Sequence, residues 1–371
     1  MSDRFDVSTR KGLFRYQRTT SGWKIAQRAF LGFPVTLTLT TPHDNTTYAA
    51  LDHGHFGIKL HRCDSGNFDN FPEITAPTYP EKPDDVPATK NPHTGAEIPW
   101  TLKLIWALET GGKDRPNRIW CGTAPGGLFH SDDRGDTWHL NEALWNMPER
   151  AHWAGGGYDY PAIHSICVDP RNPHHLAVAV STGGVWFTED DGQTWSCPGK
   201  GMRAEYMPPE LAEEPIAQDV HCLVRCPASP DTLWVQHHNG IFHSTDNGRN
   251  WTEITNVKPS AFGFPVAVHP TDPDTAWFVP AKKDEFRIPV DGKVVVTRTT
   301  DGGKSFEAFT NGLPQEDAYD LVFRHALALD STGTKLVMGS TTGNLWISED
   351  SGESWTNLSN HLPPVHAVRF I

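Results

Sequence analysis

Long hydrophobic segments are absent from this 371-residue sequence. A transmembrane helix needs about 20 consecutive, mostly apolar residues, and no run in the chain approaches that length. The N-terminal segment MSDRFDVSTRK also lacks the apolar core that signal peptides carry. We therefore expect a cytoplasmic protein that has no membrane partner.

Positive charge is scarce as well. The chain has 32 lysines and arginines against 45 aspartates and glutamates, which gives a net charge of −13 at pH 7 with neutral histidines. Nucleic acids are polyanions, and the proteins that bind them usually carry an excess of positive charge on the binding face. The composition therefore argues against a nucleic-acid partner.

Cysteines are few, and their spacing favours neither disulfides nor zinc. The chain has six, and Cys222 and Cys226 lie four positions apart in a predicted strand. At about 3.3 Å per residue this spacing separates them by roughly 13 Å, too far for a local disulfide or a shared zinc ion. We expect the cysteines to be reduced and to serve as small core residues.

What the sequence does contain is a repeated turn. Residues 343–358, GNLWISEDSGESWTNL, are typical of a β-hairpin with Ser348-x-Asp350-x-Gly352-x-x-Trp355 at its turn. The Ser and Asp side chains can hydrogen-bond the amides of the turn itself. The glycine reaches positive φ without strain, and the tryptophan supplies a large apolar anchor. We call this four-position segment a box turn.

The box turn recurs along the chain. From Trp138 to Trp195 the interval is 57 residues, and from Phe306, which replaces tryptophan in one copy, to Trp355 it is 49. Two degenerate copies bring the total to seven, and a period of this size indicates an array of similar units. The further complete copies span 131–138, 188–195, 244–251 and 299–306, and the degenerate ones lie in 12–25 and 57–68.

Complete units have two further apolar strands ahead of the hairpin, as at residues 162–168 and 176–180 in the fourth unit. Four strands in each of seven units predict an all-β fold, a seven-bladed β-propeller with four-stranded antiparallel blades, as a single domain over residues 1–371. The chain begins with a second-strand pattern at 7–12 and ends with an innermost-strand pattern at 364–370. We therefore expect the C-terminal strand to join the N-terminal blade and close the ring.

The S/T-x-D-x-G-x-x-W segments at this spacing resemble the Asp-box, or BNR, repeat. The resemblance covers nearly the whole chain. It is to a broad superfamily that contains sialidases, xyloglucanase-type glycoside hydrolases, sortilin-type receptor propellers and photosystem-assembly propellers. The Asp-Pro-x-Asn-Pro turn at residues 169–173 is similar to the xyloglucanase and sortilin branch. The resemblance implies a propeller but leaves the function open, because the superfamily holds both enzymes and binding proteins.

If the strands alternate in direction, every box turn joins a third to a fourth strand and lies on one rim of the ring. The long insertions then lie on the opposite rim, and loops raised on a rigid scaffold are where functional residues concentrate. We interpret the box aspartates as structural turn residues and expect the site on the rim with the insertions. These insertions are residues 71–99, 139–161, 198–217 and 281–293.

Residues 286–289, Phe-Arg-Ile-Pro, resemble the FRIP motif of sialidases. This resemblance implies that Arg287 grips a substrate carboxylate in a two-pronged ion pair. In sialidases the motif precedes the boxes, whereas here it lies between two complete copies. The surrounding loop is equally typical of a solvated hairpin.

The remaining candidates are polar residues at the starts of the innermost strands and in the loops between second and third strands. Three aspartates could act in pairs on a glycosidic bond, or could merely line a wet channel. The histidines form no HExxH motif, so we expect no metal and no cofactor. The catalytic candidates are Asp159, Asp219 and Asp320, and the substrate-binding candidates are Arg287, His164, His221, Arg324, His325, His366, His53, His237, His238, Tyr160 and Trp153.

Two functional hypotheses follow. In the first, the protein is a carbohydrate-directed propeller, like the sialidases or xyloglucanases, that hydrolyses a glycosidic bond and takes a glycan or other small polar ligand. In the second, it is a non-catalytic scaffold that binds a protein or peptide on the same rim. Turnover of a glycoside, lost on Asp159→Asn or Asp219→Asn, would separate the two.

Overall fold

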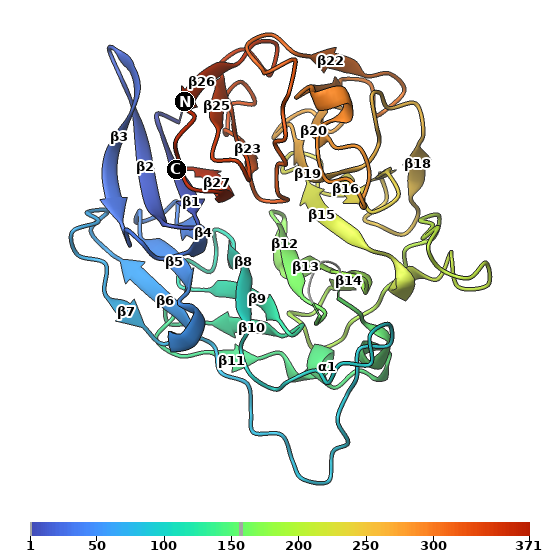
Figure 1. The fold of residues 1–371 in the computed structure, drawn as a ribbon. Coiled ribbons are helices and arrows are strands. Elements are labelled where there is room, and N and C mark those ends of the chain that lie inside the picture. Colours follow the sequence, from blue (N-terminus) through green and yellow to red (C-terminus); the bar gives the residue numbers. More distant parts are fainter. Residues whose placement is uncertain (1, 156–158) are drawn as a thin grey trace.

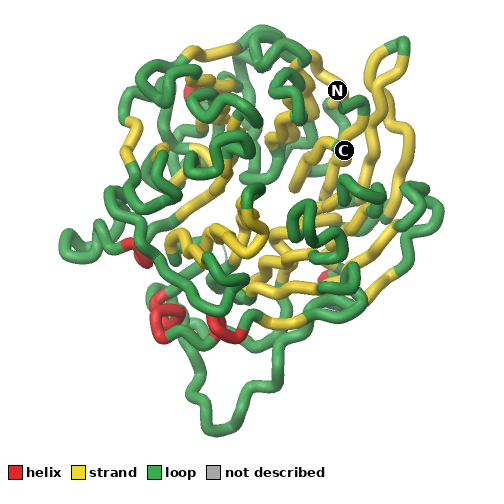
Figure 2. Tube along the Cα trace, turned by 180° about the vertical axis from the view of Figure 1, so that it is seen from behind, coloured by secondary structure: helices red, strands yellow, loops and turns green. Residues whose placement is uncertain are grey.

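The computed structural model describes residues 2–155 and 159–371, which form seven β-sheets arranged in a ring around a central axis (Figure 1). Each sheet is one blade, and its strands run antiparallel from the axis to the perimeter. The predicted seven-bladed propeller is confirmed. Helix is confined to short segments, shown in red in Figure 2: α1 (Glu142–Trp145) and the 3-10 turns η1 (Gly54–Phe56), η2 (Pro148–His152), η3 (Pro215–Ala217) and η4 (Val290–Gly292).

The blades are numbered in chain order, and their strands are given from the axis outward. Blade 1 contains β27 (Val365–Phe370), β1 (Arg4–Thr9), β2 (Gly12–Thr19) and β3 (Gly22–Ala29). Blade 2 contains β4 (Val35–Thr40), β5 (Thr47–Asp52), β6 (Ile58–Cys63) and β7 (Glu73–Ile74). Blade 3 contains β8 (Leu104–Thr110), β9 (Ile119–Ala124), β10 (Leu128–Ser131) and β11 (His139–Leu140).

The second half of the ring repeats this order. Blade 4 contains β12 (Ile163–Asp169), β13 (Asn172–Val180) and β14 (Gly184–Thr188), and blade 5 contains β15 (Val220–Arg225), β16 (Leu233–His237), β17 (Ile241–Ser244) and β18 (Thr252–Ile254). Blade 6 contains β19 (Gly263–Val268), β20 (Ala276–Pro280), β21 (Val296–Thr299) and β22 (Glu307–Phe309). Blade 7 contains β23 (Leu327–Leu329), β24 (Leu336–Gly339), β25 (Leu345–Ser348) and β26 (Thr356–Ser359).

Blade 4 departs from the expected four strands. Its sheet has three, and the outermost position is reduced to one bridge between Phe187 and Ser196. Residues 197–214 then leave the sheet in a long insertion toward blade 5. The short edge leaves few backbone groups free to pair with another chain.

The ring closes as predicted. Strand β27 pairs antiparallel with β1, from Phe370 opposite Phe5 to Val365 opposite Thr9. The two termini therefore lie beside each other in Figure 1, and the first blade is made from both ends of the chain. Val365 and Val368 are buried in this closing strand, so hydrophobic packing holds the ring shut in addition to the backbone ladder.

The box turn has the hydrogen bonds that its residues were expected to make. In blade 4 the Thr188 hydroxyl donates to Asp190 Oδ1 at 2.8 Å and accepts from the Gly192 amide at 2.9 Å, while Gly192 has φ of 83°. A fifth position was not anticipated: Thr194 donates to Asp190 through both its amide and its hydroxyl, at 2.9 and 2.6 Å. These hydrogen bonds from Thr194, with smaller contributions from Thr188, lower the pKa of Asp190 to about 2.

The same arrangement occurs in the other complete box turns, where a donor side chain again precedes the aromatic anchor. The donors are Thr137, Asn250, Ser305 and Ser354, each bonded to its own box aspartate. Each box carboxylate thus accepts hydrogen bonds from residues of its own turn. Their interpretation as structural residues agrees with this geometry.

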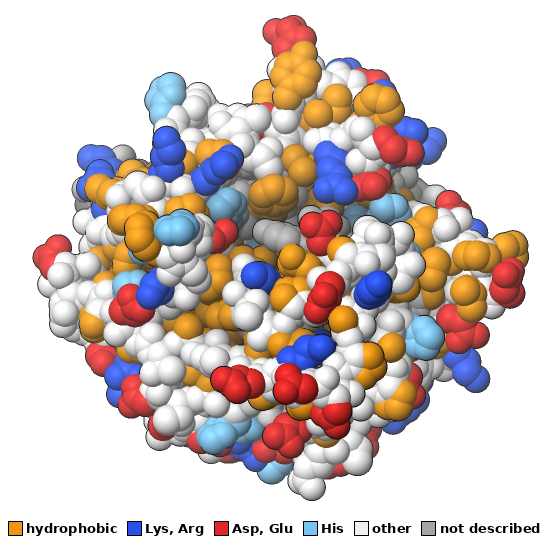
Figure 3. Space-filling model, turned by 60° about the horizontal axis from the view of Figure 1, so that its bottom comes forward, with side chains coloured by type: hydrophobic (Ala, Val, Ile, Leu, Met, Phe, Trp, Pro, Cys, Tyr) orange, Lys and Arg blue, Asp and Glu red, His pale blue; other side chains and the backbone are white. Residues whose placement is uncertain are grey.

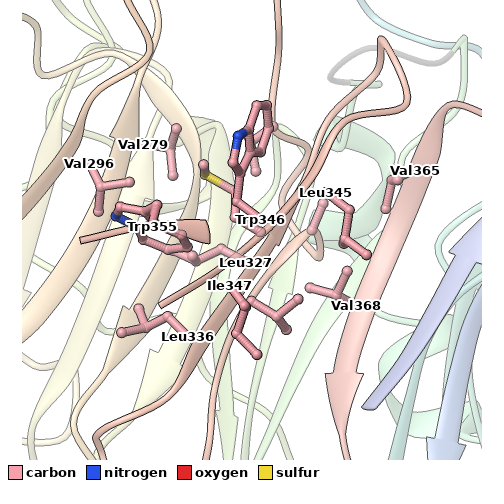
Figure 4. Packing of buried hydrophobic residues seen from close by; sticks show 14 of the residues in the cluster. Val279, Val296, Leu327, Leu336, Leu345, Trp346, Ile347, Trp355, Val365 and Val368 are labelled. Atoms are coloured by element: carbon pink, nitrogen blue, oxygen red, sulfur yellow. The ribbon is translucent and has the colours of Figure 1, made fainter. Parts of the chain in front are cut away.

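The hydrophobic core lies between adjacent blades. The largest cluster joins Trp277 of blade 6, Trp346 and Leu345 of blade 7, and Phe5 of blade 1. Figure 4 shows Leu345 beside the closing strand that carries Val365 and Val368, and Trp346 on the side away from that strand. Because each blade buries its faces against its neighbours, the ring holds the innermost strands at fixed distances around the axis. No helix in the described part of the chain is long and apolar enough to span a bilayer.

Candidate functional site

A cavity of about 960 Å³ lies at the centre of the ring. It is bordered by loops that join second to third strands, such as those carrying His53, His238 and Arg287, so it opens on the rim opposite the box turns. Figure 3 shows the central hollow with acidic and basic side chains around it. The volume lies within the range of small-molecule binding sites. The expected rim therefore contains the main cavity.

One structural device aims side chains into this cavity. In blades 1 to 6 the innermost strand skips one or two residues in its pairing with the second strand, which marks a β-bulge. A bulge turns the extra side chain away from the regular alternation of the strand. The skipped positions include Thr36, Trp106, His221, Phe264 and His366, which line the cavity, and His164, which does not.

The most concentrated chemistry is in blade 5. Asp219 precedes β15, His221 occupies the bulge of β15, and His238 follows β16. Asp219 Oδ2 lies 3.4 Å from His238 Nδ1 and 4.0 Å from His221 Nε2. The His238 amide also donates to the Asp219 carbonyl at 2.9 Å, which fixes the loop against the strand. Asp219 and His221 are both buried, although they line the cavity.

The electrostatics of the three groups follow from burial and mutual attraction. Burial favours the neutral form of Asp219, but the hydrogen-bonding contact with His238 and the attraction of the neighbouring histidines, when they are protonated, outweigh it and lower its pKa. Burial likewise opposes the charged form of His238, whose pKa is nevertheless raised by Asp219. For His221 burial dominates and lowers the pKa to about 4. Asp219 is therefore an ionised carboxylate at neutral pH, and His221 is a neutral imidazole.

Arg287 faces the same cavity but already has a partner. Its Nε donates to Asp284 Oδ1 at 2.9 Å, and the guanidinium lies 5.4 Å from the ring centre of Phe264. Phe264 in turn stacks on His221 with ring centres 4.5 Å apart. A ligand carboxylate would have to compete with Asp284 for this arginine, so a carboxylate clamp is not preformed.

Two residues of blade 7 complete the lining near the axis. The Arg324 guanidinium lies 4.1 Å from the ring centre of Trp106, and His325 Nε2 lies 2.8 Å from the His164 carbonyl oxygen. His366 bonds the Val35 carbonyl at 3.0 Å. The innermost strands thus contact one another across and around the axis.

Eight of the fourteen predicted site residues line the cavity. They come from blades 1, 2, 5, 6 and 7, so the ring does bring together positions that are distant in sequence. The eight are Asp219, His221, His238, Arg287, Arg324, His325, His366 and His53.

Two of the three predicted catalytic aspartates lie elsewhere. Asp320 is buried in a turn, where it accepts hydrogen bonds from Ser340 at 2.6 Å, from Asn344 at 2.8 Å and from Thr342. Asp159 is exposed, and its backbone carbonyl accepts a bond from the Asn91 side chain at 2.9 Å. Neither lines the cavity, so the expected grouping of these two with Asp219 is not what the fold produces.

Four predicted binding residues also lie outside the lining. His164, His237 and Trp153 are fully buried, and Tyr160 is half-buried. Trp153 packs on Trp186 with ring centres 5.6 Å apart, as a core residue does. Of the four, only His164 lies at a bulge of an innermost strand; His237 ends the second strand β16, and Trp153 and Tyr160 lie outside the strands.

Sequence reasoning missed Trp106, Phe264 and Asp284, which line the cavity. Asp284 lies three residues before Arg287 in the same loop, so the sequence could have predicted that it lies near this arginine. Trp106 and Phe264 lie at bulges of the innermost strands, and an irregularity of pairing leaves no mark in a single sequence. Only the folded chain shows that Trp106 and Phe264 line the cavity.

Comparison with known proteins gives similarity in sequence to one class of enzyme. No family model matches the chain. It is 27% identical over 227 residues to a probable oligoxyloglucan-reducing end-specific xyloglucanase of Neosartorya fischeri, a match that covers 52% of this chain and 25% of the relative. The matched region is thus about a quarter of the length of that relative.

Comparison of structures gives propellers. A putative 6-phosphogluconolactonase from Bacteroides uniformis superposes with a TM-score of 0.60 at 11% identity, covering 100% of both chains. An ancestral GH74 enzyme gives 0.56 at 16% identity, over 91% of this chain and 38% of that one. YCF48 bound to D1 peptide gives 0.52 at 12% identity, over 87% and 80%. These likenesses show the fold alone.

Proposed function

We propose that this chain is a carbohydrate-directed propeller that binds a glycan in the central cavity and hydrolyses a glycosidic bond there. The observation that carries the proposal is the position of an ionised carboxylate, Asp219, in a cavity that also presents the rings of Trp106, Phe264 and Tyr206. Aromatic faces stack on sugar rings, and carboxylates provide the acid, base or nucleophile of glycoside hydrolysis.

The sequence comparison supports this choice of ligand. The xyloglucanase of Neosartorya fischeri acts on oligoxyloglucan by its name, and the match extends over about half of this chain. The repeated box turns additionally support a place for the chain among the Asp-box propellers, as the resemblance of the motif implies. A β-linked oligosaccharide related to xyloglucan is accordingly the first substrate to test.

The chemistry requires two carboxyl groups with different protonation states. Asp219, whose pKa is lowered, takes the role of base or nucleophile. Of the other carboxylates in the lining, Asp284 is paired with Arg287, whereas Asp52 accepts only an amide hydrogen bond from Gly54 among the described contacts. We propose Asp52 as the second carboxylate of the reaction.

The test is a panel of fluorogenic glycosides and xyloglucan oligosaccharides, read by product release and by thermal shift. Wild type is expected to cleave at least one member, and Asp219→Asn to lower kcat by about 100-fold or more because it removes a charge that touches the transition state. Asp114→Asn is the matched control, an exposed aspartate in the turn between β8 and β9. Unchanged turnover in Asp219→Asn would contradict the assignment.

The non-catalytic scaffold remains a distinct outcome of the same panel. It is favoured by the separation of Asp159 and Asp320 from the cavity, which removes the carboxylate pairs that the sequence suggested. YCF48, a structural neighbour, is bound to a peptide. Absence of both turnover and thermal stabilisation by every glycan would overturn our proposal and support a peptide ligand on this rim.

A further inference from the structure

Three potential metal ligands converge in blade 5. One donor atom each from Asp219, His221 and His238 lies within 4.8 Å of the other two. In a tetrahedral site with bonds of about 2.0–2.1 Å, ligand atoms lie about 3.3 Å apart. The separations from Asp219 Oδ2, 3.4 Å to His238 and 4.0 Å to His221, approach that spacing.

The orientation of His221 is fixed in the manner of a metal ligand. Its Nδ1 lies 2.7 Å from the carbonyl oxygen of Gly263 in the neighbouring blade. A carbonyl oxygen can only accept a hydrogen bond, so Nδ1 carries the hydrogen; in the neutral ring the lone pair is then on Nε2, which lies 4.0 Å from Asp219 Oδ2. Histidines that bind metals are typically oriented by a hydrogen bond of this kind on the other ring nitrogen.

Asp219 provides the second observation. Its side chain is about 90% buried, yet Oδ1 has no hydrogen-bond partner among the described residues. Buried carboxylate oxygens nearly always have a donor or a cation, because an unsatisfied one loses its solvation without compensation. The unsatisfied atom belongs to a side chain that lines the cavity, beside two imidazoles.

We propose that Asp219, His221 and His238 bind one divalent transition-metal ion of the zinc type, with a remaining coordination position that faces the central cavity. Two imidazoles and one carboxylate suit zinc and its first-row neighbours, whereas calcium and magnesium prefer oxygen ligands throughout. Three protein ligands with an open position are the pattern of catalytic rather than structural zinc sites. This site was not expected from the sequence, which contains no HExxH motif.

The charges around the cluster define what the open position would take. Arg324 and Arg287 line the same cavity as the three ligands, and their guanidinium groups attract an anion. The ligand class of the open position is therefore hydroxide or an oxyanion such as a carboxylate.

The experiment measures metal binding in the absence of any substrate. Chelator-treated full-length protein is titrated with Zn²⁺ against a chromophoric competitor, and metal content is measured after gel filtration. We expect one Zn²⁺ per chain, and Co²⁺ substitution should give the visible absorption bands of a four-coordinate ion. His238→Ala, which alters a partly exposed loop residue, should weaken affinity by at least about tenfold, the loss that even second-shell changes produce.

Controls separate this site from weak surface binding by other histidines. His93→Ala removes an exposed histidine that lines the same cavity outside the cluster, and it should bind Zn²⁺ as wild type does. Asp219→Asn is the second cluster variant, with circular dichroism to verify its fold. A stoichiometry near zero in wild type, or equal affinities in wild type and a folded His238→Ala, would overturn the proposal.

The metal and glycan experiments have separate readouts, although both proposals use Asp219: a carboxylate bound to zinc would not act as the free base or nucleophile of the proposed hydrolysis. Stoichiometric Zn²⁺ binding without any effect of glycans would retain the metal site and reject the carbohydrate assignment. Glycoside turnover by protein that binds no metal would do the reverse.

Discussion

The Nε2 atom of His325 lies 2.8 Å from the carbonyl oxygen of His164. His164 belongs to β12, the innermost strand of blade 4, and His325 lies two residues before β23, the innermost strand of blade 7. Blades 4 and 7 lie on opposite sides of the ring, so the hydrogen bond crosses the axis (Figure 1). Residues 320–326 of blade 7 leave regular pairing to make this contact possible. His325 lines the cavity, so this hydrogen bond ties two opposite blades together at the cavity wall.

The first prediction concerns the pH dependence of stability. Burial and the charges of Arg324 and Arg369 lower the pKa of His325 to about 4, although its bond to His164 opposes the shift. An unfolded histidine has a pKa of about 6.5, so between pH 6.5 and 4 the unfolded chain binds more protons than the folded one. Stability should fall as pH decreases through this window, by up to about 1.4 kcal/mol per pH unit for this group.

Denaturant unfolding at several pH values checks this contribution. His325→Gln retains a donor for the His164 carbonyl but does not titrate, so the slope between pH 6.5 and 4 should flatten. His361→Gln, at an exposed histidine, is the control and should leave the slope unchanged. Equal slopes for all three proteins would show that the pKa of His325 is the same in the folded and unfolded chains.

The second prediction concerns the box turns. Asp190→Ala should lower the free energy of unfolding by about 2 kcal/mol, because the amide and hydroxyl of Thr194 and the hydroxyl of Thr188 lose their acceptor. Glu189→Ala changes the neighbouring exposed residue and should stay within about 0.5 kcal/mol of wild type. Urea denaturation measures both. Similar values for the two variants would contradict a structural role for the box carboxylate.

The third prediction concerns ring closure. Truncation before Val365 removes β27 and leaves the backbone of β1 unpaired along its inner edge. An exposed edge strand promotes association with other chains, and the loss of Val365 and Val368 opens the core between blades 7 and 1. We expect aggregation in size-exclusion chromatography and loss of cooperative unfolding. Removal of Ile371 alone serves as the control, since it leaves β27 in place and loses one hydrogen bond, from the Ile371 amide to the Arg4 carbonyl.

The fourth prediction distinguishes the three aspartates that the sequence grouped together. Asp320→Ala should destabilise the fold by about 1–3 kcal/mol, because Ser340 and Asn344 lose a buried acceptor. Asp159→Asn should change neither stability nor the response to glycans, since this side chain is exposed and outside the cavity. Thermal unfolding with and without the best glycan measures both effects. Loss of the glycan-induced thermal shift in Asp159→Asn would contradict this prediction and support the grouping of Asp159 with Asp219 and Asp320.

The sequence alone determined the architecture of this protein. The interval between Trp138, Trp195 and the later anchors specifies how many blades there are, since each box turn bonds its own backbone and requires no distant partner. Ring closure was readable for the same reason: residues 7–12 and 364–370 carry the patterns of two strands from one blade. Local hydrogen bonds and strand periodicity depend on residues that are close together in the chain, so both can be predicted from the sequence.

Only the tertiary structure decided the site. Asp219, His221 and His238 cluster because a bulge turns His221 toward the cavity and a loop folds His238 back over Asp219. Asp320 occupies a similar sequence position but is held by Ser340 and its neighbours. A shift of one residue in strand pairing, together with contacts between blades, decides whether a polar side chain faces the cavity or forms hydrogen bonds inside a turn. The spacing of residues in the sequence specifies neither of these.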